Sequence, residues 1–115
     1  MIVYGIKNCD TMKKAFTWLD NHKIDYQFQD YRNPPLPAET LLELIDKIGL
    51  DQLVNKRSTS WRALSESEKK SVMERSEAVA ILQAHPTLIK RPVVVTADQA
   101  FVGFSDALYS ETFLK

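Results

Sequence analysis

The chain contains a single cysteine, Cys9, and the residues around it could make its thiol reactive. It lies where the apolar run 2–4 gives way to residues with the apolar spacing of a helix. A thiol at a helix start is close to unpaired backbone N–H groups and to the positive end of the helix dipole, which both favour the thiolate. Lys13 follows four residues later on the same helical face, so its charge could act on the sulfur. One interpretation of this pattern is therefore a nucleophilic cysteine.

A purely structural role for Cys9 is the alternative, because a free cysteine packs well as a small buried side chain. Its neighbours Asn8 and Asp10 have an ordinary use too, since their side-chain oxygens can cap the helix by accepting its first amide hydrogens. The spacing alone does not decide between the two roles.

A second candidate region is "KRPVVV", where Arg91 and Pro92 precede an apolar strand. Proline has no amide hydrogen and suits the first position of a strand. Arg91 is either an ordinary surface charge or a ligand, because a guanidinium offers a planar fork to a carboxylate or oxyanion. The same two interpretations apply to the cations around Trp61, which are Lys56, Arg57 and Arg62.

The order of expected elements predicts a small α/β domain with a helical insertion. A strand at 2–4, a helix ending near Asn21 and an alternating strand at 24–31 form a βαβ unit with parallel strands. The prolines of "RNPPLP" interrupt both helix and strand. Helices follow at 38–48, at 66–75 and at 76–85, with a loop at 55–65. The chain then closes with strands at 91–95 and 100–104, which form a hairpin, and with a helix capped by Ser105.

Composition narrows the classes of function. The 115 residues carry no net charge, which argues against nucleic acid as a partner. No apolar run approaches the roughly 20 residues needed to cross a bilayer, and the start lacks the pattern of a signal peptide. One cysteine forms no internal disulfide and, with His22 and His85, makes a poor metal set. We therefore expect a cytoplasmic, metal-free monomer with no membrane contact.

The ordered combination of "YGIKNCDTMKKA", "NKRSTSW" and "KRPVVV" resembles the arsenate reductase-like family that includes ArsC, Spx and YffB proteins. The cysteine segment and the "NKRST-W" loop are most similar to the YffB branch. The resemblance covers nearly the whole chain and implies a thioredoxin-like (glutaredoxin-like) α/β fold. We expect one domain over 1–115, with a mixed four-stranded sheet and a helical insertion at about 37–85. It also implies a nucleophilic cysteine at Cys9 and a cis proline at Pro92.

The YffB branch implies a glutathione-dependent thiol reductase. The chain has no resolving cysteine, since Met12 stands where Spx proteins often have a second one, so glutathione would be the co-substrate. The partner is then glutathione or a disulfide substrate. Arg91, with Arg57 or Lys13, would hold a glutathione carboxylate or stabilise the thiolate, and Pro92 would present backbone to an extended substrate. We assign catalysis to Cys9, Lys13 and Arg91, and substrate binding to Asn8, Arg57, Arg91 and Pro92.

Two other functions remain open within this family. The Spx proteins imply a non-catalytic regulator that binds RNA polymerase or another protein. Arsenate reduction is disfavoured, because Gly5 and Lys13 stand where arsenate reductases have a histidine and an arginine. The segment around Phe104 also offers no cation after the last strand, and a doubly charged oxyanion needs paired cations.

Overall fold

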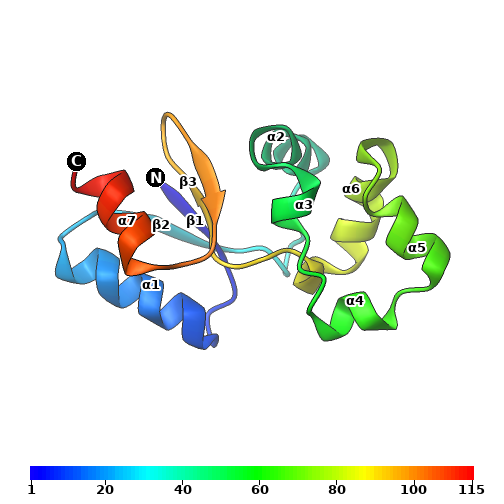
Figure 1. Cartoon of the computed structure of the whole chain (residues 1–115), viewed down its shortest axis with the longest axis horizontal. Helices are drawn as coiled ribbons and strands as arrows, with labels where there is room; N and C mark the ends of the chain where they lie inside the picture. Colours follow the sequence, from blue (N-terminus) through cyan, green and yellow to red (C-terminus); the bar gives the residue numbers. More distant parts are fainter. The chain divides into compact units, whose positions relative to one another are not determined.

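The two ends of the chain form one mixed β-sheet (Figure 1). Its strands are β1 (Ile2–Gly5), β2 (Gln27–Asp30), β3 (Val93–Val95) and β4 (Ala100–Val102). They are arranged in the order β2-β1-β3-β4, with β1 and β2 parallel and the other pairs antiparallel. Helix α1 (Asp10–Asn21) makes the crossover between the parallel strands, and α7 (Asp106–Phe113) follows β4. This arrangement confirms the predicted fold class.

The computed structural model describes residues 1–115 and divides the chain into two compact units. The sheet unit comprises Met1–Asp30 and Arg91–Lys115, and the helical unit comprises Tyr31–Lys90. Helices α2 to α6 lie within the stretch for which the sequence predicts the insertion. That the whole chain behaves as a single domain stays a prediction.

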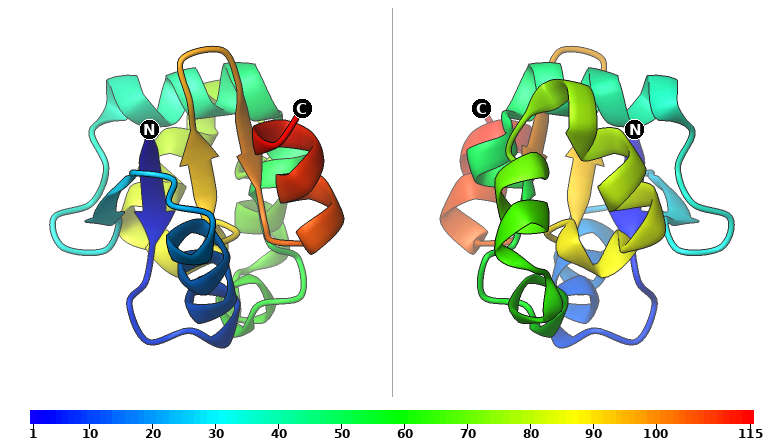
Figure 2. Two further views of the ribbon diagram at one scale, coloured as in Figure 1. Left: turned by 90° about the vertical axis from the view of Figure 1, so that its left-hand side faces the viewer. Right: turned by 90° about the vertical axis from the view of Figure 1, so that its right-hand side faces the viewer.

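The core of the sheet unit lies between the sheet and its two helices. Figure 2 (left) shows α1 and α7 on the same face of the sheet. Met12, Ala15 and Leu19 are fully buried, as the helical spacing predicts. Trp18 is also buried, at 7% exposure, and its Nε1 donates to Asp106 Oδ1 at 2.5 Å, which ties α1 to α7. The same spacing also predicts Phe16 on this face, but Phe16 is only partly buried.

The helical unit contains more breaks than the sequence indicates. Its elements are α2 (Ala38–Ile48), α3 (Leu50–Leu53), α4 (Thr59–Ala63), α5 (Glu66–Ser71), α6 (Arg75–Ala84) and the short 3-10 helix η1 (Pro86–Leu88). The prediction of a loop over 55–65 was wrong in part, because Ser58 accepts a hydrogen bond from Trp61 N at 3.0 Å and caps α4 there. The charged helix ends at Ser71, not at Arg75, which instead begins α6.

The beginning and the end of the helical unit are tied together by a buried hydrogen bond. The Tyr31 hydroxyl donates to the Ile89 carbonyl at 2.8 Å, and Tyr31 is 1% exposed. Ile89 also forms an isolated bridge with Val54. The proline-rich segment that follows Tyr31 contains neither helix nor strand, as predicted, and its Asn33–Pro34 peptide bond is cis.

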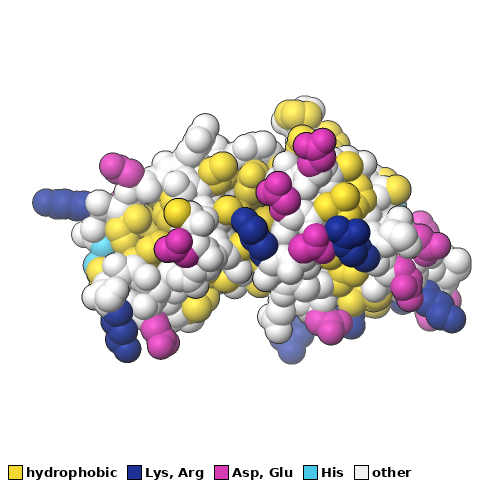
Figure 3. All heavy atoms as spheres, turned by 90° about the horizontal axis from the view of Figure 1, so that it is seen from above, with side chains coloured by type: hydrophobic (Ala, Val, Ile, Leu, Met, Phe, Trp, Pro, Cys, Tyr) yellow, Lys and Arg dark blue, Asp and Glu magenta, His cyan; other side chains and the backbone are white.

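Charged side chains of both signs are interspersed on the face drawn in Figure 3. None of the helices combines the length and the apolar character that crossing a membrane would require. The structure gathers no group of three or more histidine, cysteine, aspartate or glutamate side chains that could hold a metal ion.

Candidate active site

Cys9 itself is the N-cap residue of α1. Its backbone is extended (φ −129°, ψ 135°), and its carbonyl accepts the first helical hydrogen bond, from Lys13 N at 2.9 Å. The prediction that Asn8 or Asp10 caps this helix was wrong. Asp10 already lies in the first turn, and Asn8 precedes the cap by one residue, so neither has the position from which a side chain caps. The thiol therefore occupies the place where most helices have a hydroxyl or carboxylate.

The register of the sheet brings a guanidinium to this thiol. Tyr4 pairs with Val93 across antiparallel strands, so Arg91, just before β3, lies beside the segment that follows β1 and leads to Cys9. Arg91 Nε donates to Cys9 Sγ at 3.4 Å. Two residues 82 positions apart in the sequence therefore form one contact.

The surroundings of Cys9 favour its thiolate. Burial raises the pKa of the thiol, but the Met12 N–H, the Arg91 guanidinium and the Thr11 N–H lower it, as does the positive charge of Arg91. The lowering effects are larger in sum, and the pKa of Cys9 lies below its ordinary value. The two amides act on the sulfur although neither forms a side-chain cap hydrogen bond of standard geometry. Cys9 is only partly buried, so the thiolate is open to a reagent.

Pro92 comes directly after Arg91 and immediately before β3. The Arg91–Pro92 peptide bond is cis, as the family resemblance implies. The carbonyl of Pro92 accepts a hydrogen bond from Gly103 N at 2.8 Å. This bond fixes the segment that carries Arg91 to the residue that follows β4.

The remaining predicted residues are placed differently. Asn8 is exposed in the turn before Cys9. Lys13 is exposed on α1, and the cation that contacts the sulfur is Arg91. Arg57 lies in the helical unit, where it lines a pocket with Lys56, Lys90 and Asp51, and its assignment to the site stays a prediction.

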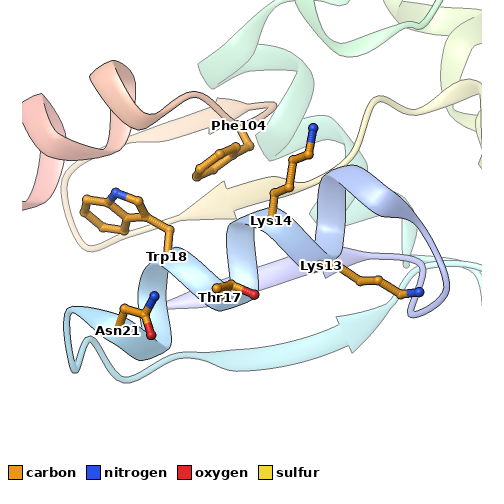
Figure 4. Close-up of a pocket in the computed structure, with 6 residues that line it drawn as sticks. All are labelled: Lys13, Lys14, Thr17, Trp18, Asn21 and Phe104. Carbon is orange, nitrogen blue, oxygen red and sulfur yellow. The ribbon is translucent and has the colours of Figure 1, made fainter.

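Sequence reasoning missed a groove on the sheet unit. It lies along α1 and is closed on one side by Phe104 (Figure 4). Lys14, Thr17, Trp18 and Asn21 recur at the spacing of one helical face, and that spacing was the available signal.

A cysteine at the start of the helix after β1, beside a cis-proline segment that enters an antiparallel strand, defines a thiol site on a thioredoxin-like fold. The chain belongs to the ArsC family, whose model matches residues 4–112. It is 45% identical to an uncharacterized protein of Haemophilus influenzae over 111 residues, which are 96% of each chain. A solved structure of a YffB protein has a TM-score of 0.86 and 38% identity, covering 96% of each chain. This likeness confirms the resemblance to the YffB branch.

The same family contains regulators. The global transcriptional regulator Spx of Streptococcus pneumoniae is 26% identical over 102 residues, which are 86% of this chain and 74% of that protein. The chain therefore has an arsenate reductase-like fold in a family whose members have more than one described role.

Proposed function

We propose that this protein is a glutathione-dependent thiol reductase in which Cys9 is the only nucleophile. The observation that supports it best is the 3.4 Å contact between Arg91 Nε and Cys9 Sγ at the start of α1. A guanidinium, two backbone amides and partial exposure together favour a reactive thiolate over a packing cysteine. The proposal includes the cytoplasm as its compartment, because reduced glutathione is abundant there.

The chemistry needs two exchanges, because the chain has one cysteine. In the first, the Cys9 thiolate attacks the glutathione sulfur of a mixed disulfide, forming a Cys9–glutathione disulfide and releasing the substrate as a thiolate that takes a proton from water. In the second, the thiolate of another glutathione attacks the glutathione sulfur on Cys9. Oxidised glutathione leaves, and the Cys9 thiolate is restored. Over both exchanges, one reduced glutathione is consumed: the substrate is released as a thiol, and its former glutathione leaves joined to the second one as oxidised glutathione.

Each residue of the site has a defined part in this proposal. The Arg91 guanidinium and the first amides of α1 stabilise the thiolate, both before attack and when it leaves in the second exchange. Lys13, one turn along α1, adds positive charge for the glutathione carboxylates, and exposed Asn8 offers an amide to the bound tripeptide. The Pro92 segment completes the proposed binding residues of the sheet unit, and the part of Arg57, in the helical unit, stays a prediction from the sequence.

The test combines mass spectrometry with a turnover assay. After incubation with oxidised glutathione, intact protein should gain one glutathione, and Cys9→Ser should gain none. With reduced glutathione present, wild-type protein should then release thiol from a glutathione mixed disulfide faster than glutathione alone, whereas Cys9→Ser should match the glutathione-only rate. Lys115→Gln, an exposed lysine at the far end of the sheet unit's sequence, serves as the control and should behave as wild type. Equal rates for wild type, Cys9→Ser and glutathione alone would refute the enzymatic proposal.

A second candidate is a regulator that acts by binding another protein, such as RNA polymerase, and the similarity to Spx supports it. This role needs the surface of the protein and not its thiol. A cellular effect that persists in Cys9→Ser would favour the regulator, and an effect lost in that variant would favour the reductase.

A further inference from the structure

The groove on α1 has a composition that suits a particular kind of ligand. It has a volume of about 390 Å³ and is lined by Lys13, Lys14, Thr17, Trp18, Asn21 and Phe104. Figure 4 shows Phe104 facing the stripe formed by Lys14, Thr17 and Trp18. Two aromatic rings and two lysines line it, and no carboxylate does. Such a lining fits a ligand with an apolar group and a negative charge.

The two rings are held in place before any ligand arrives. Trp18 donates its Nε1–H to Asp106 and stacks on His22 with a centroid separation of 3.9 Å. Phe104 packs edge-on against buried Tyr109, with centroids 4.8 Å apart. Since these contacts lie within the sheet unit, the groove is preformed and its aromatic walls lose little conformational entropy on binding.

The groove begins one turn from the nucleophile on the same helix. At about 1.5 Å per residue, Lys13 lies about 6 Å and Trp18 about 13 Å along the axis of α1 from Cys9. An extended peptide advances about 3.3 Å per residue, so the fourth residue from a glutathionylated cysteine held beside Cys9 reaches Trp18. Glutathione, with one residue on each side of its cysteine, is too short to fill this distance.

We propose that the groove docks a peptide segment of a glutathionylated substrate protein, with an apolar side chain against Trp18 and Phe104 and an acidic one against Lys14. This inference rests on the proposed function and names its substrate class. The occupant is a protein segment because the groove extends several residues beyond the thiol, and it is acidic because the only charges lining the groove are positive.

Binding is tested apart from thiol chemistry. The protein is Cys9→Ser, and the probe is a peptide with serine in place of its cysteine, with Glu two residues away to meet Lys14 and Phe four residues away to meet Trp18. We expect NMR shifts at the Trp18 indole and at the amides of Lys14 and Phe104. Lys14→Glu should weaken binding about three- to tenfold, and Lys115→Gln should leave it unchanged. Absence of shifts at these groups, or equal binding of a peptide with Ala and Gln at those positions, would overturn the proposal.

Turnover is tested in the otherwise wild-type chain with glutathionylated peptides. The Phe–Glu peptide should have a kcat/KM several-fold above the Ala–Gln peptide, and Lys14→Glu should remove this preference. The same variant should keep the wild-type rate on the mixed disulfide of glutathione and 2-mercaptoethanol, which is too small to reach the groove. Turnover of both peptides at the same kcat/KM would contradict peptide docking in the groove but would still support the thiol reductase. Specific binding without any turnover would refute the reductase and support peptide docking alone.

Discussion

At the scale of single residues, the proposed activity depends on the environment of one sulfur. The Cys9 thiol is at the cap position of α1, and Arg91 Nε contacts it at 3.4 Å. A hydrogen bond from a charged donor stabilises an anion more than a neutral thiol, so it favours ionisation. Arg91 is therefore the residue whose removal should change the reactivity of Cys9 most without touching the cysteine itself.

Replacing Arg91 should slow the reaction of Cys9 with an alkylating reagent at pH 7. Arg91→Met removes both the donor and the charge, so the thiol pKa rises and the thiolate fraction falls. We expect a decrease of several-fold, and a smaller one for Arg91→Lys, which keeps the charge but not the planar fork. The rate of iodoacetamide labelling measures this. Arg62→Met, which removes an exposed cation from the helical unit, is the control, and an equal decrease in that variant would contradict a specific role for Arg91.

The lowered pKa of Cys9 should also appear in the pH dependence of stability. A thiol whose folded pKa is below its unfolded value contributes stability that is fully present above the unfolded pKa, about 8.5, and is lost as the pH falls through the folded pKa. The free energy of unfolding of wild type minus that of Cys9→Ala should therefore increase from pH 6 to pH 9. Urea unfolding at both pH values measures the difference. A difference that decreases with pH would mean that the folded state prefers the neutral thiol.

At the scale of elements, the end of β1 and the start of α1 are in close contact. A Cβ placed on Gly5 would lie 2.5 Å from both Sδ and Cε of Met12, which is fully buried. Glycine is favoured here by this close approach and not by its backbone conformation, since its φ is not positive. The side chain of Met12 thereby occupies the place that a larger residue at position 5 would need.

Gly5→Ala should destabilise the protein by about 1 kcal/mol, because the added methyl forces the flexible end of the buried Met12 side chain to move. Thermal or urea unfolding measures this cost. In the double variant Gly5→Ala with Met12→Ala the added methyl finds space, so its cost should be smaller than in the single variant. Strictly additive costs would show that the clash with Met12 is not the cause.

Sequence patterns predicted most of the elements but not their exact breaks. The spacing of Met12, Ala15, Phe16 and Leu19 predicts the buried face of α1, and all of them but Phe16 are fully buried. Ser105 caps α7 with a hydrogen bond from Leu108 N, as expected. The helix α4 was missed because "NKRSTSW" is polar and its single turn has no apolar face, so only the Ser58 cap indicated it. Short helices leave too few residues for a period to be visible.

The site was only partly predictable, for a different reason. The position of Cys9 at a helix start follows from local sequence. Its contact with Arg91 depends on the pairing of β1 with β3, and residue spacing alone does not predict that pairing. The expectation that Arg91 acts near Cys9 came from the family resemblance. The groove at Phe104 depends in the same way on the tertiary placement of α7 beside α1.

At the scale of the whole molecule, the chain leaves the sheet unit after Asp30 and re-enters it at Arg91. The helical unit closes on itself where it begins and ends, through Tyr31 and Ile89. Segments inserted into another unit are tolerated when their two ends are close together. The Tyr31 hydroxyl is therefore a candidate for the contact that keeps this insertion compact at its base.

Tyr31→Phe should destabilise the protein by about 1–3 kcal/mol. It removes a buried hydroxyl and leaves the Ile89 carbonyl, in a residue 1% exposed, without that donor. Urea unfolding gives the change in free energy, and hydrogen exchange of the amides of residues 31–90 shows whether the loss is local. A variant with wild-type stability would show that the bond contributes nothing net. Tyr26→Phe is the comparison: it removes the hydrogen bond of a partly buried tyrosine to Asp20, and its cost should be smaller because the groups left behind are open to water.

The measurement that tests the central claim most directly is the pH titration of Cys9 by alkylation rate in the wild-type protein. Because the chain has one cysteine, the whole signal comes from that thiol. We predict a midpoint clearly below that of a free cysteine, about 8.5, and a shift to higher pH in Arg91→Met. A wild-type midpoint at or above the free-cysteine value would contradict an activated nucleophile at the start of α1.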